Sequence, residues 1–133
     1  MRKLTCIIDD DTIYTKLLIR LLKLKKLCSR ILVFKNGKEA IEFFQNLSPK
    51  ERLENTPELI FLDINMPVMN GWEFLNEFKN IRANIDNKLL LYVVSSSIDP
   101  MDYQKAKEIE IVDGYLSKPV SMETFNQIFN TAC

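Results

Sequence analysis

The feature that most constrains the fold is a series of short apolar runs, most of which stop abruptly at a polar side chain. Within these runs apolar and polar residues do not alternate. A continuous apolar run of four to eight residues is typical of a strand that is covered on both faces. We therefore predict five buried strands, over residues 4–8, 31–34, 59–62, 89–94 and 114–117.

Each predicted strand is followed by a segment whose apolar residues recur with helical spacing. Asp99 followed by Pro100 is a typical helix start, with an N-cap and a proline at the first helical position. The polar stretch over residues 48–57 contains two prolines and predicts a loop. The predicted helices span residues 12–27, 38–47, 72–81, 99–107 and 121–130. In the first helix we expect the core-facing stripe to comprise Ile13, Leu17, Leu21 and Leu24, widened by Leu18 and Leu22.

The alternation of strands and helices predicts the fold class. Successive strand–helix units with continuously apolar strands form a parallel sheet sandwiched between helices. A chain of 133 residues fits one domain. We therefore expect an α/β fold, a five-stranded doubly wound parallel sheet with helices on both faces, as a single domain over residues 1–133.

The composition excludes several classes of function. The chain has no histidine, which excludes Ser-His and Cys-His nucleophile pairs and histidine metal ligands. Its three glycines cannot form a GxGxxG or Walker A phosphate loop. Eighteen basic and eighteen acidic side chains cancel, so we expect no nucleic-acid partner. The basic stretch then reads as a solvated helix end; it comprises Arg20, Lys23, Lys25, Lys26 and Arg30.

Cysteine content and hydropathy indicate a compartment. The three cysteines are widely spaced and form no CxxC motif, and no signal peptide precedes them, so they read as free thiols in a reducing cytoplasm. No apolar run approaches the roughly 20 residues that a membrane span requires. We therefore expect a cytoplasmic protein that does not bind a membrane.

Polar side chains collect at the carboxyl ends of the predicted strands. Asp9 and Asp10 follow the first strand, Asp63 the third, Ser95 the fourth and Lys118 the fifth. Ligands of open α/β sheets bind at this edge. Clustered carboxylates repel one another unless a cation lies among them, and hard oxygen donors favour Mg²⁺, with Mn²⁺ as a second option. The pattern predicts a magnesium-dependent phosphoryl site with an aspartate as nucleophile.

Each of these residues also has a simpler interpretation when taken alone. Asp9 and Asp10 could cap a helix and form a solvated turn. Ser95 could satisfy backbone groups at a strand end, and Lys118 could be an ordinary surface lysine. The arrival of all five at one edge is what favours the site.

The residues at these strand ends resemble those of the response-regulator receiver family. The resemblance rests on Asp9-Asp10-Asp11, on Asp63-Ile64-Asn65-Met66-Pro67, on Ser95-Ser96 and on Lys118-Pro119, and it covers essentially the whole chain. It implies a flavodoxin-like sheet with strand order 2-1-3-4-5, no output domain, and a cis Lys118-Pro119 peptide.

The resemblance also implies a role for each site residue. Asp63 would be the phosphoacceptor and a metal ligand. Asp10 would bind magnesium directly and Asp9 through a water, and Asn65 would offer its backbone carbonyl. Lys118 would bind the phosphoryl group. Ser95 and Tyr115 would form the switch, although Tyr115 could also be an ordinary tyrosine at the edge of the core.

The function implied is that of a two-component phosphorelay response regulator and not of a turnover enzyme. Asp63 would accept a phosphoryl group from a phosphohistidine of a sensor histidine kinase or a histidine phosphotransfer protein. The signal would pass to an unknown downstream protein through the strands and helices of residues 89–130, with a phosphorylation-dependent homodimer as one form. Two alternatives stay open: a magnesium-dependent phosphohydrolase, against which Asn65 argues because it cannot act as a general acid, and a receiver-like interaction module that is never phosphorylated.

Overall fold

A five-stranded parallel sheet forms the centre of the computed structural model, which describes residues 2–86 and 88–131. The strand order is β2-β1-β3-β4-β5, and all four pairings are parallel. This confirms the predicted order 2-1-3-4-5. The strands are β1 (Arg2–Ile8), β2 (Cys28–Phe34), β3 (Leu59–Leu62), β4 (Leu90–Ser95) and β5 (Gly114–Ser117).

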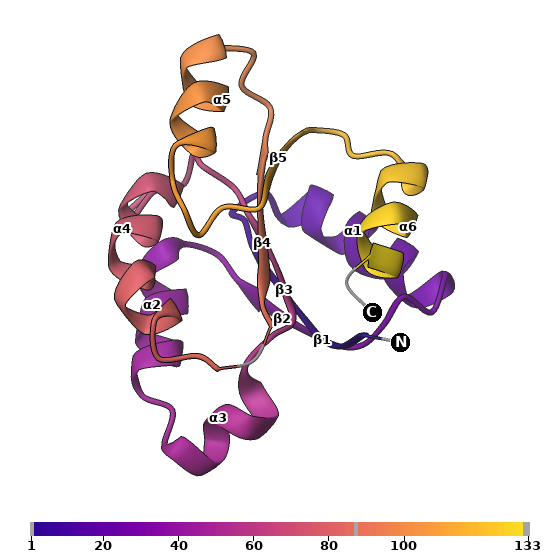
Figure 1. Ribbon diagram of the computed structural model, residues 1–133. Coiled ribbons are helices and arrows are strands. Elements are labelled where there is room, and N and C mark those ends of the chain that lie inside the picture. The colour runs from indigo at the N-terminus through magenta and orange to yellow at the C-terminus, as the bar shows by residue number, and fades with distance from the viewer. Residues whose placement is uncertain (1, 87, 132–133) are drawn as a thin grey trace.

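Helices cover both faces of the sheet, as the alternation of elements predicts (Figure 1). On one face lie α1 (Thr12–Leu24) and α6 (Met122–Thr131). On the other lie α2 (Gly37–Gln45), α4 (Gly71–Arg82) and α5 (Pro100–Lys107). The predicted N-cap of α5 is present, because the Asp99 side chain accepts a hydrogen bond from the Met101 amide at 2.9 Å.

The hydrophobic core is divided by the sheet into two clusters. Successive residues of β1 point to opposite faces, so Cys6 and Ile8 join the cluster under α2, α4 and α5, whereas Ile7 joins the cluster under α1 and α6. Aromatic rings fill both clusters: the Phe74 and Phe78 rings stack at 5.0 Å between centroids in the first. All four residues of β3 are buried, as predicted. The edge strands β2 and β5 are only partly buried, so the prediction of strands covered on both faces was wrong for these two.

One predicted loop is a helix. Residues 48–57 contain α3 (Pro49–Asn55), a seven-residue helix. The Ser48 side chain accepts a hydrogen bond from the Glu51 amide at 3.2 Å, and the Glu51 carboxylate accepts one from the Ser48 amide at 3.0 Å. This capping box, with Pro49 at the first turn, is the start signal that the prediction of a loop passed over. Pro49 is the first residue of this helix and Pro57 lies beyond its end, so neither proline interrupts it.

The predicted core-facing stripe of the first helix was right only for Leu18 and Leu22, the residues that widen it. The buried residues of α1 are Thr15, Leu18 and Leu22. The stripe starting at Ile13 instead faces solvent: Ile13 is 75% exposed and Leu24 is 70% exposed. The helix also ends at Leu24 and not at residue 27. Two apolar rows run along this helix, and helical periodicity alone does not say which of them is buried.

Gly71 brings the start of α4 directly onto the end of β3. A Cβ atom at position 71 would lie 2.5 Å from the Asp63 carbonyl oxygen and 2.8 Å from the Ile64 Cα atom. The Gly71 amide donates to the Ile64 carbonyl at 2.8 Å. The absence of a side chain here therefore lets the helix pack against the backbone that carries Asp63. Among the described helices, none is both long and apolar enough to cross a membrane.

Candidate functional site

The parallel ladder of the sheet continues into the residues that carry the chemistry. The Asp9 amide donates to the Phe34 carbonyl at 3.0 Å, and the Asp63 amide donates to the Ile8 carbonyl at 2.8 Å. The Lys118 amide donates to the Ser95 carbonyl at 2.9 Å. Because each residue is fixed by the neighbouring strand, their positions relative to one another follow from the sheet itself.

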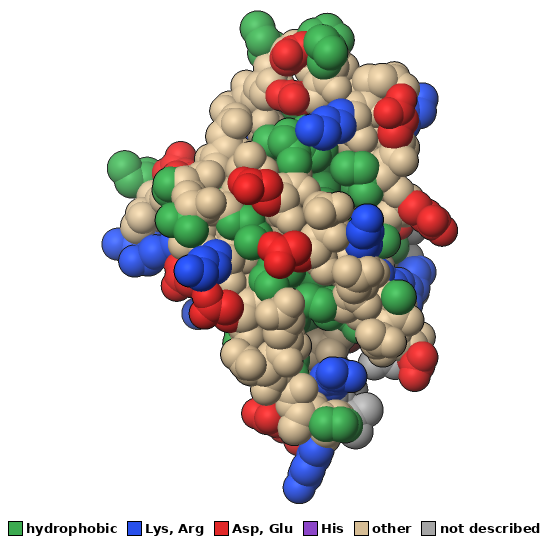
Figure 2. Space-filling model, turned by 90° about the vertical axis from the view of Figure 1, so that its left-hand side faces the viewer, with side chains coloured by type: hydrophobic (Ala, Val, Ile, Leu, Met, Phe, Trp, Pro, Cys, Tyr) green, Lys and Arg blue, Asp and Glu red, His purple; other side chains and the backbone are tan. Residues whose placement is uncertain are grey.

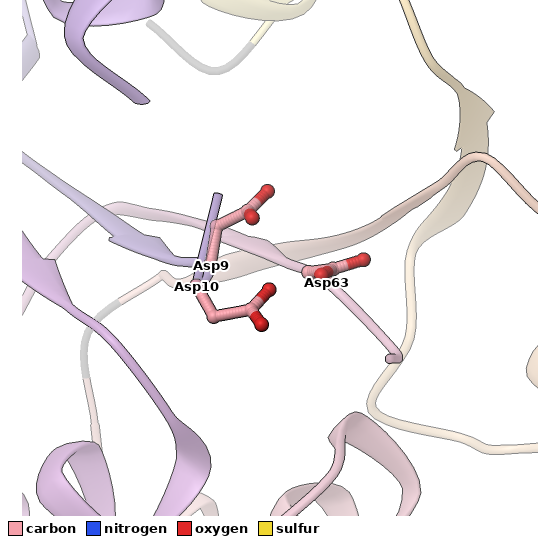
Figure 3. A group of neighbouring side chains, drawn as sticks. All are labelled: Asp9, Asp10 and Asp63. Atoms are coloured by element: carbon pink, nitrogen blue, oxygen red, sulfur yellow. The ribbon is translucent and has the colours of Figure 1, made fainter. Parts of the chain in front are cut away.

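Three carboxylates meet at this edge. One carboxylate oxygen each from Asp9, Asp10 and Asp63 lies within 4.8 Å of the other two. The carboxylates extend from the ends of β1 and β3 (Figure 3). Asp9 and Asp63 are buried, with 4% and 6% of their surface exposed, whereas Asp10 is exposed. The site is therefore shielded at its base and open to solvent on one side.

Lys118 supplies a positive charge next to these carboxylates. Its Nζ atom lies 2.8 Å from Asp9 Oδ2 and 3.8 Å from Asp63 Oδ1, and its side chain is 15% exposed. The Lys118-Pro119 peptide bond is cis, as the resemblance implied. One ammonium group against three carboxylates leaves the cluster with an excess of negative charge.

The excess negative charge contributes to a raised pKa of Asp63. Burial raises the pKa of Asp63 to about 6, the Asp9 and Asp10 carboxylates push the pKa in the same direction, and the Lys118 ammonium opposes them. An aspartate that shares a buried site with two others is thus harder to ionise than an aspartate in water. A bound cation would relieve this repulsion.

The donor set fits a hard divalent cation. All three clustered groups are carboxylates, which Mg²⁺ and Mn²⁺ prefer, and both described cysteines are buried as free thiols in the core. Asp10, as the exposed member, faces the open side from which an ion would enter. The geometry therefore suits a cation held by Asp9, Asp10 and Asp63 that keeps further coordination positions for other oxygens.

The predicted switch residues lie at the neighbouring strands. Ser95 is fully buried, and its Oγ accepts a hydrogen bond from the Ser97 amide at 3.0 Å. The Tyr115 hydroxyl donates to the Ser97 carbonyl at 3.5 Å, and the Ser97 hydroxyl donates to Asp102 Oδ2 at 2.6 Å. Ser97 thus connects the end of β4, the start of α5 and the middle of β5.

Asn65 lies on the exposed part of the loop that follows β3. It is two residues beyond Asp63, and neighbouring Ile64 is buried and fixed by its hydrogen bond from Gly71. Asn65 therefore lies in the loop that directly follows Asp63. The role of Asn65 as a metal ligand stays a prediction.

Sequence reasoning missed one residue of the site, Tyr14. Its ring lies next to the Lys118 ammonium, with 4.5 Å between Nζ and the ring centroid. Its amide donates to the side chain of Asp11, the N-cap of α1, at 3.0 Å. Local spacing gives no signal for this contact, because Lys118 lies more than one hundred residues further along the chain.

A pocket with no acidic cluster lies elsewhere on the molecule. It has a volume of about 670 Å³ and is lined by Trp72, Leu75, Arg82, Ile109 and Glu110, among others. None of the clustered carboxylates lines it. On the face formed by α2, α4 and α5, basic and acidic side chains are interspersed and not gathered by sign (Figure 2).

Comparison with known proteins agrees with this geometry. A family model described as the response regulator receiver domain matches residues 5–130. The chain belongs to this family. Members of this family are phosphoryl-accepting signalling domains of two-component systems. The predicted resemblance is confirmed.

Individual relatives support the assignment. A two-component response regulator from Cytophaga hutchinsonii has a solved structure with a TM-score of 0.86 and 32% identity, which covers 98% of this chain and 96% of that one. "Hybrid signal transduction histidine kinase I" of Dictyostelium discoideum is 29% identical over 92% of this chain. The transcriptional regulatory protein HptR of Staphylococcus aureus is 34% identical over 65% of this chain. The chain spans only 7% and 28% of the length of these last two relatives.

Proposed function

We propose that Asp63 is the phosphoacceptor of this receiver domain. The observation that carries the proposal is the cluster itself: a buried carboxylate with two others within 4.8 Å and an ammonium group at 3.8 Å. In the proposed reaction an Asp63 carboxylate oxygen attacks the phosphorus atom of a phosphohistidine. The new O–P bond forms as the N–P bond breaks, and the released imidazole takes up a proton.

The other site residues would hold the cation and bind the phosphoryl group. Asp9 and Asp10, together with Asp63 and the Asn65 carbonyl, would hold Mg²⁺ or Mn²⁺. When bound, the cation supplies positive charge for the phosphoryl oxygens. Lys118 would leave its contact with Asp9 and pair with a phosphoryl oxygen. Such charge-assisted donors, fixed before the reaction, are the main source of stabilisation in phosphoryl transfer.

The output would run through Ser95 and Tyr115. In the described structure the Ser95 hydroxyl accepts from Ser97, and Tyr115 donates to the same residue. A charged phosphoryl oxygen at Asp63 would accept a hydrogen bond from the Ser95 hydroxyl more strongly than a neutral oxygen does. The resulting shift of Ser95 would move the loop through which Ser97 contacts α5. Phosphorylation thus biases the surface of β4, α5, β5 and α6 between two states. A cytoplasmic downstream protein, or a second copy of the chain, would read that surface.

The phosphodonor would be a sensor histidine kinase or a histidine phosphotransfer protein. The exposed apolar row of α1 supports a docking surface beside the acceptor, since Ile13 and Leu17 are 75% and 57% exposed and the helix starts three residues after Asp9. Lys16 and Arg20 flank this row, which favours an acidic partner. Leu17→Ser should slow transfer from a phosphohistidine protein and leave labelling by acetyl phosphate unchanged.

The proposal is tested by the intact mass of the protein after incubation with acetyl phosphate, with and without Mg²⁺. We expect one magnesium-dependent phosphoryl adduct that Asp63→Asn abolishes and that the matched change Asp86→Asn, at an exposed position in the loop before β4, retains. Labelling that survives in Asp63→Asn would refute the acceptor. Continuous release of phosphate from an aryl phosphate would favour a phosphohydrolase, and the absence of any adduct would favour an interaction module that is never phosphorylated.

A further inference from the structure

Tyr14 is fixed relative to the carboxylates by a short chain of hydrogen bonds. The Asp11 amide donates to Asp9 Oδ1 at 2.9 Å, and the Tyr14 amide donates to Asp11 Oδ1 at 3.0 Å. Asp11 is also the N-cap of α1, so the same contact that starts the helix sets the place of Tyr14. The tyrosine therefore belongs to the local structure of the acidic loop and not only to the helix.

The ring of Tyr14 forms one wall around the Lys118 ammonium. Nζ lies 4.5 Å from the ring centroid, 2.8 Å from Asp9 Oδ2 and 3.8 Å from Asp63 Oδ1. A cation within about 6 Å of an aromatic face is attracted by the ring, and the attraction grows when water is excluded. The Lys118 side chain is 15% exposed, so this contact is largely shielded from solvent.

The hydroxyl of Tyr14 does not explain its position. It is buried and has no hydrogen-bond partner among the described residues. Burial, together with the nearby carboxylates of Asp9, Asp63 and Asp11, raises the pKa of Tyr14 to about 12, so the phenol is neutral near pH 7. A phenolate–ammonium ion pair is thus excluded, and the aromatic face is the part of the side chain that acts on Lys118.

We propose that Tyr14 is a positioning residue that holds the Lys118 ammonium at the phosphoacceptor through its ring face. The inference rests on the proposed role of Asp63. Lysine has a flexible side chain with high rotamer entropy, and Lys118 must exchange Asp9 for a phosphoryl oxygen during the reaction. The ring restricts the ammonium to positions near both carboxylates while leaving it free to change partner, because attraction to a ring face is less directional than a hydrogen bond.

The first test is independent of phosphorylation. Protons on the Lys118 carbon next to Nζ should show an upfield ring-current shift in the NMR spectrum of the native protein, relative to the exposed Lys107. Tyr14→Phe should keep the shift and Tyr14→Leu should remove it. An unshifted Lys118 signal in the native protein would overturn the inference even if Asp63 is phosphorylated as proposed.

The second test measures the rate of labelling by acetyl phosphate. Tyr14→Leu should slow labelling about tenfold, whereas Tyr14→Phe should stay within about twofold of the native rate because the ring face is retained. In a Lys118→Met background, Tyr14→Leu should have no further effect, since the two residues act as one unit. An equal tenfold loss in that background would contradict the inference, as would a Tyr14→Phe variant as slow as Tyr14→Leu.

The two tests separate the inference from the function on which it rests. If the native protein shows the ring-current shift but no labelling dependent on Asp63, the proposed function fails and the contact stands as a structural one, which overturns the positioning role. If labelling depends on Asp63 and Tyr14→Leu labels at the native rate, only the role of Tyr14 fails.

Discussion

In the acceptor region, which comprises Asp9, Asp10, Asp63 and Lys118, three carboxylates share one ammonium group. In the switch region, which comprises Ser95, Ser97, Asp102 and Tyr115, every hydroxyl makes a hydrogen bond with a neighbour. The acceptor region therefore carries unbalanced charge, whereas the hydroxyl groups of the switch region are held by hydrogen bonds.

This difference explains how one edge of a sheet can both bind a phosphoryl group and change conformation in response to it. Unbalanced charge makes the acceptor region dependent on added ligands, a cation and then a phosphoryl group. Satisfied hydrogen bonds give the switch region a defined resting state, which changes only when a better acceptor is offered to Ser95. Substitutions should accordingly have large, electrostatic effects in the first region and small, local effects in the second.

Among variants that keep Asp63, the largest effect is expected for Lys118→Met in the acceptor region. Loss of the ammonium removes a donor that is already in place for the phosphoryl oxygens, and labelling by acetyl phosphate should slow about 100-fold. The control is Lys107→Met at the exposed end of α5, which should label at the native rate. Equal rates for the two variants would show that Lys118 serves only to neutralise the resting cluster.

The second prediction concerns the stability of the resting cluster without divalent cations. The pKa of Asp63 is raised to about 6, above its ordinary value near 3.8. The ionised group therefore destabilises the fold above pH 6, and the cost disappears as the pH falls below about 4, where the group is protonated in both the folded and the unfolded state. Asp63→Asn should raise the free energy of unfolding at pH 7.5 by about 2 kcal/mol.

Urea unfolding at two pH values, in the presence of a chelator, measures this effect. The gain from Asp63→Asn should be present at pH 7.5 and nearly absent at pH 3.5. Saturating Mg²⁺ should stabilise the native protein more than the variant, because the variant lacks one carboxylate ligand. A gain that is the same at both pH values would show that burial of an amide, and not charge, produces it.

The smallest effect is expected for Ser95→Ala in the switch region. The side chain is fully buried and accepts one hydrogen bond from the Ser97 amide, so its loss should lower the free energy of unfolding by about 1 kcal/mol. Labelling should slow less than in Lys118→Met. Ser96→Ala, at an exposed neighbouring position, is the control and should change neither quantity. A loss of labelling as large as that of Lys118→Met would remove the distinction between the two regions.

The sequence was sufficient for much of the fold because the constraints were local and repeated. Continuous apolar strands require cover on both faces, and parallel strands bring their carboxyl ends to one edge, so the meeting of Asp9, Asp63 and Lys118 followed from the order of elements. The strand order came from the family resemblance, since periodicity does not determine which strands pair.

The errors have equally specific causes. Ser48 and Glu51 form a capping box, which Pro49 inside it and Pro57 after the helix concealed. On α1, rows at Leu17 and Leu18 are both apolar, and only tertiary packing decides that Leu18 is buried. Tyr14 was missed because its role depends on contact with Lys118, which lies more than one hundred residues further along the chain. Contacts of this kind have no signature in local spacing.

The most direct test of the central claim is to locate the phosphoryl group chemically. After labelling with acetyl phosphate and Mg²⁺, borohydride reduction converts an aspartyl phosphate to homoserine, and peptide mass spectrometry identifies the converted position. We predict homoserine at position 63 and aspartate retained at positions 9 and 10. Conversion at either of those positions, or none after a complete labelling reaction, would contradict the account.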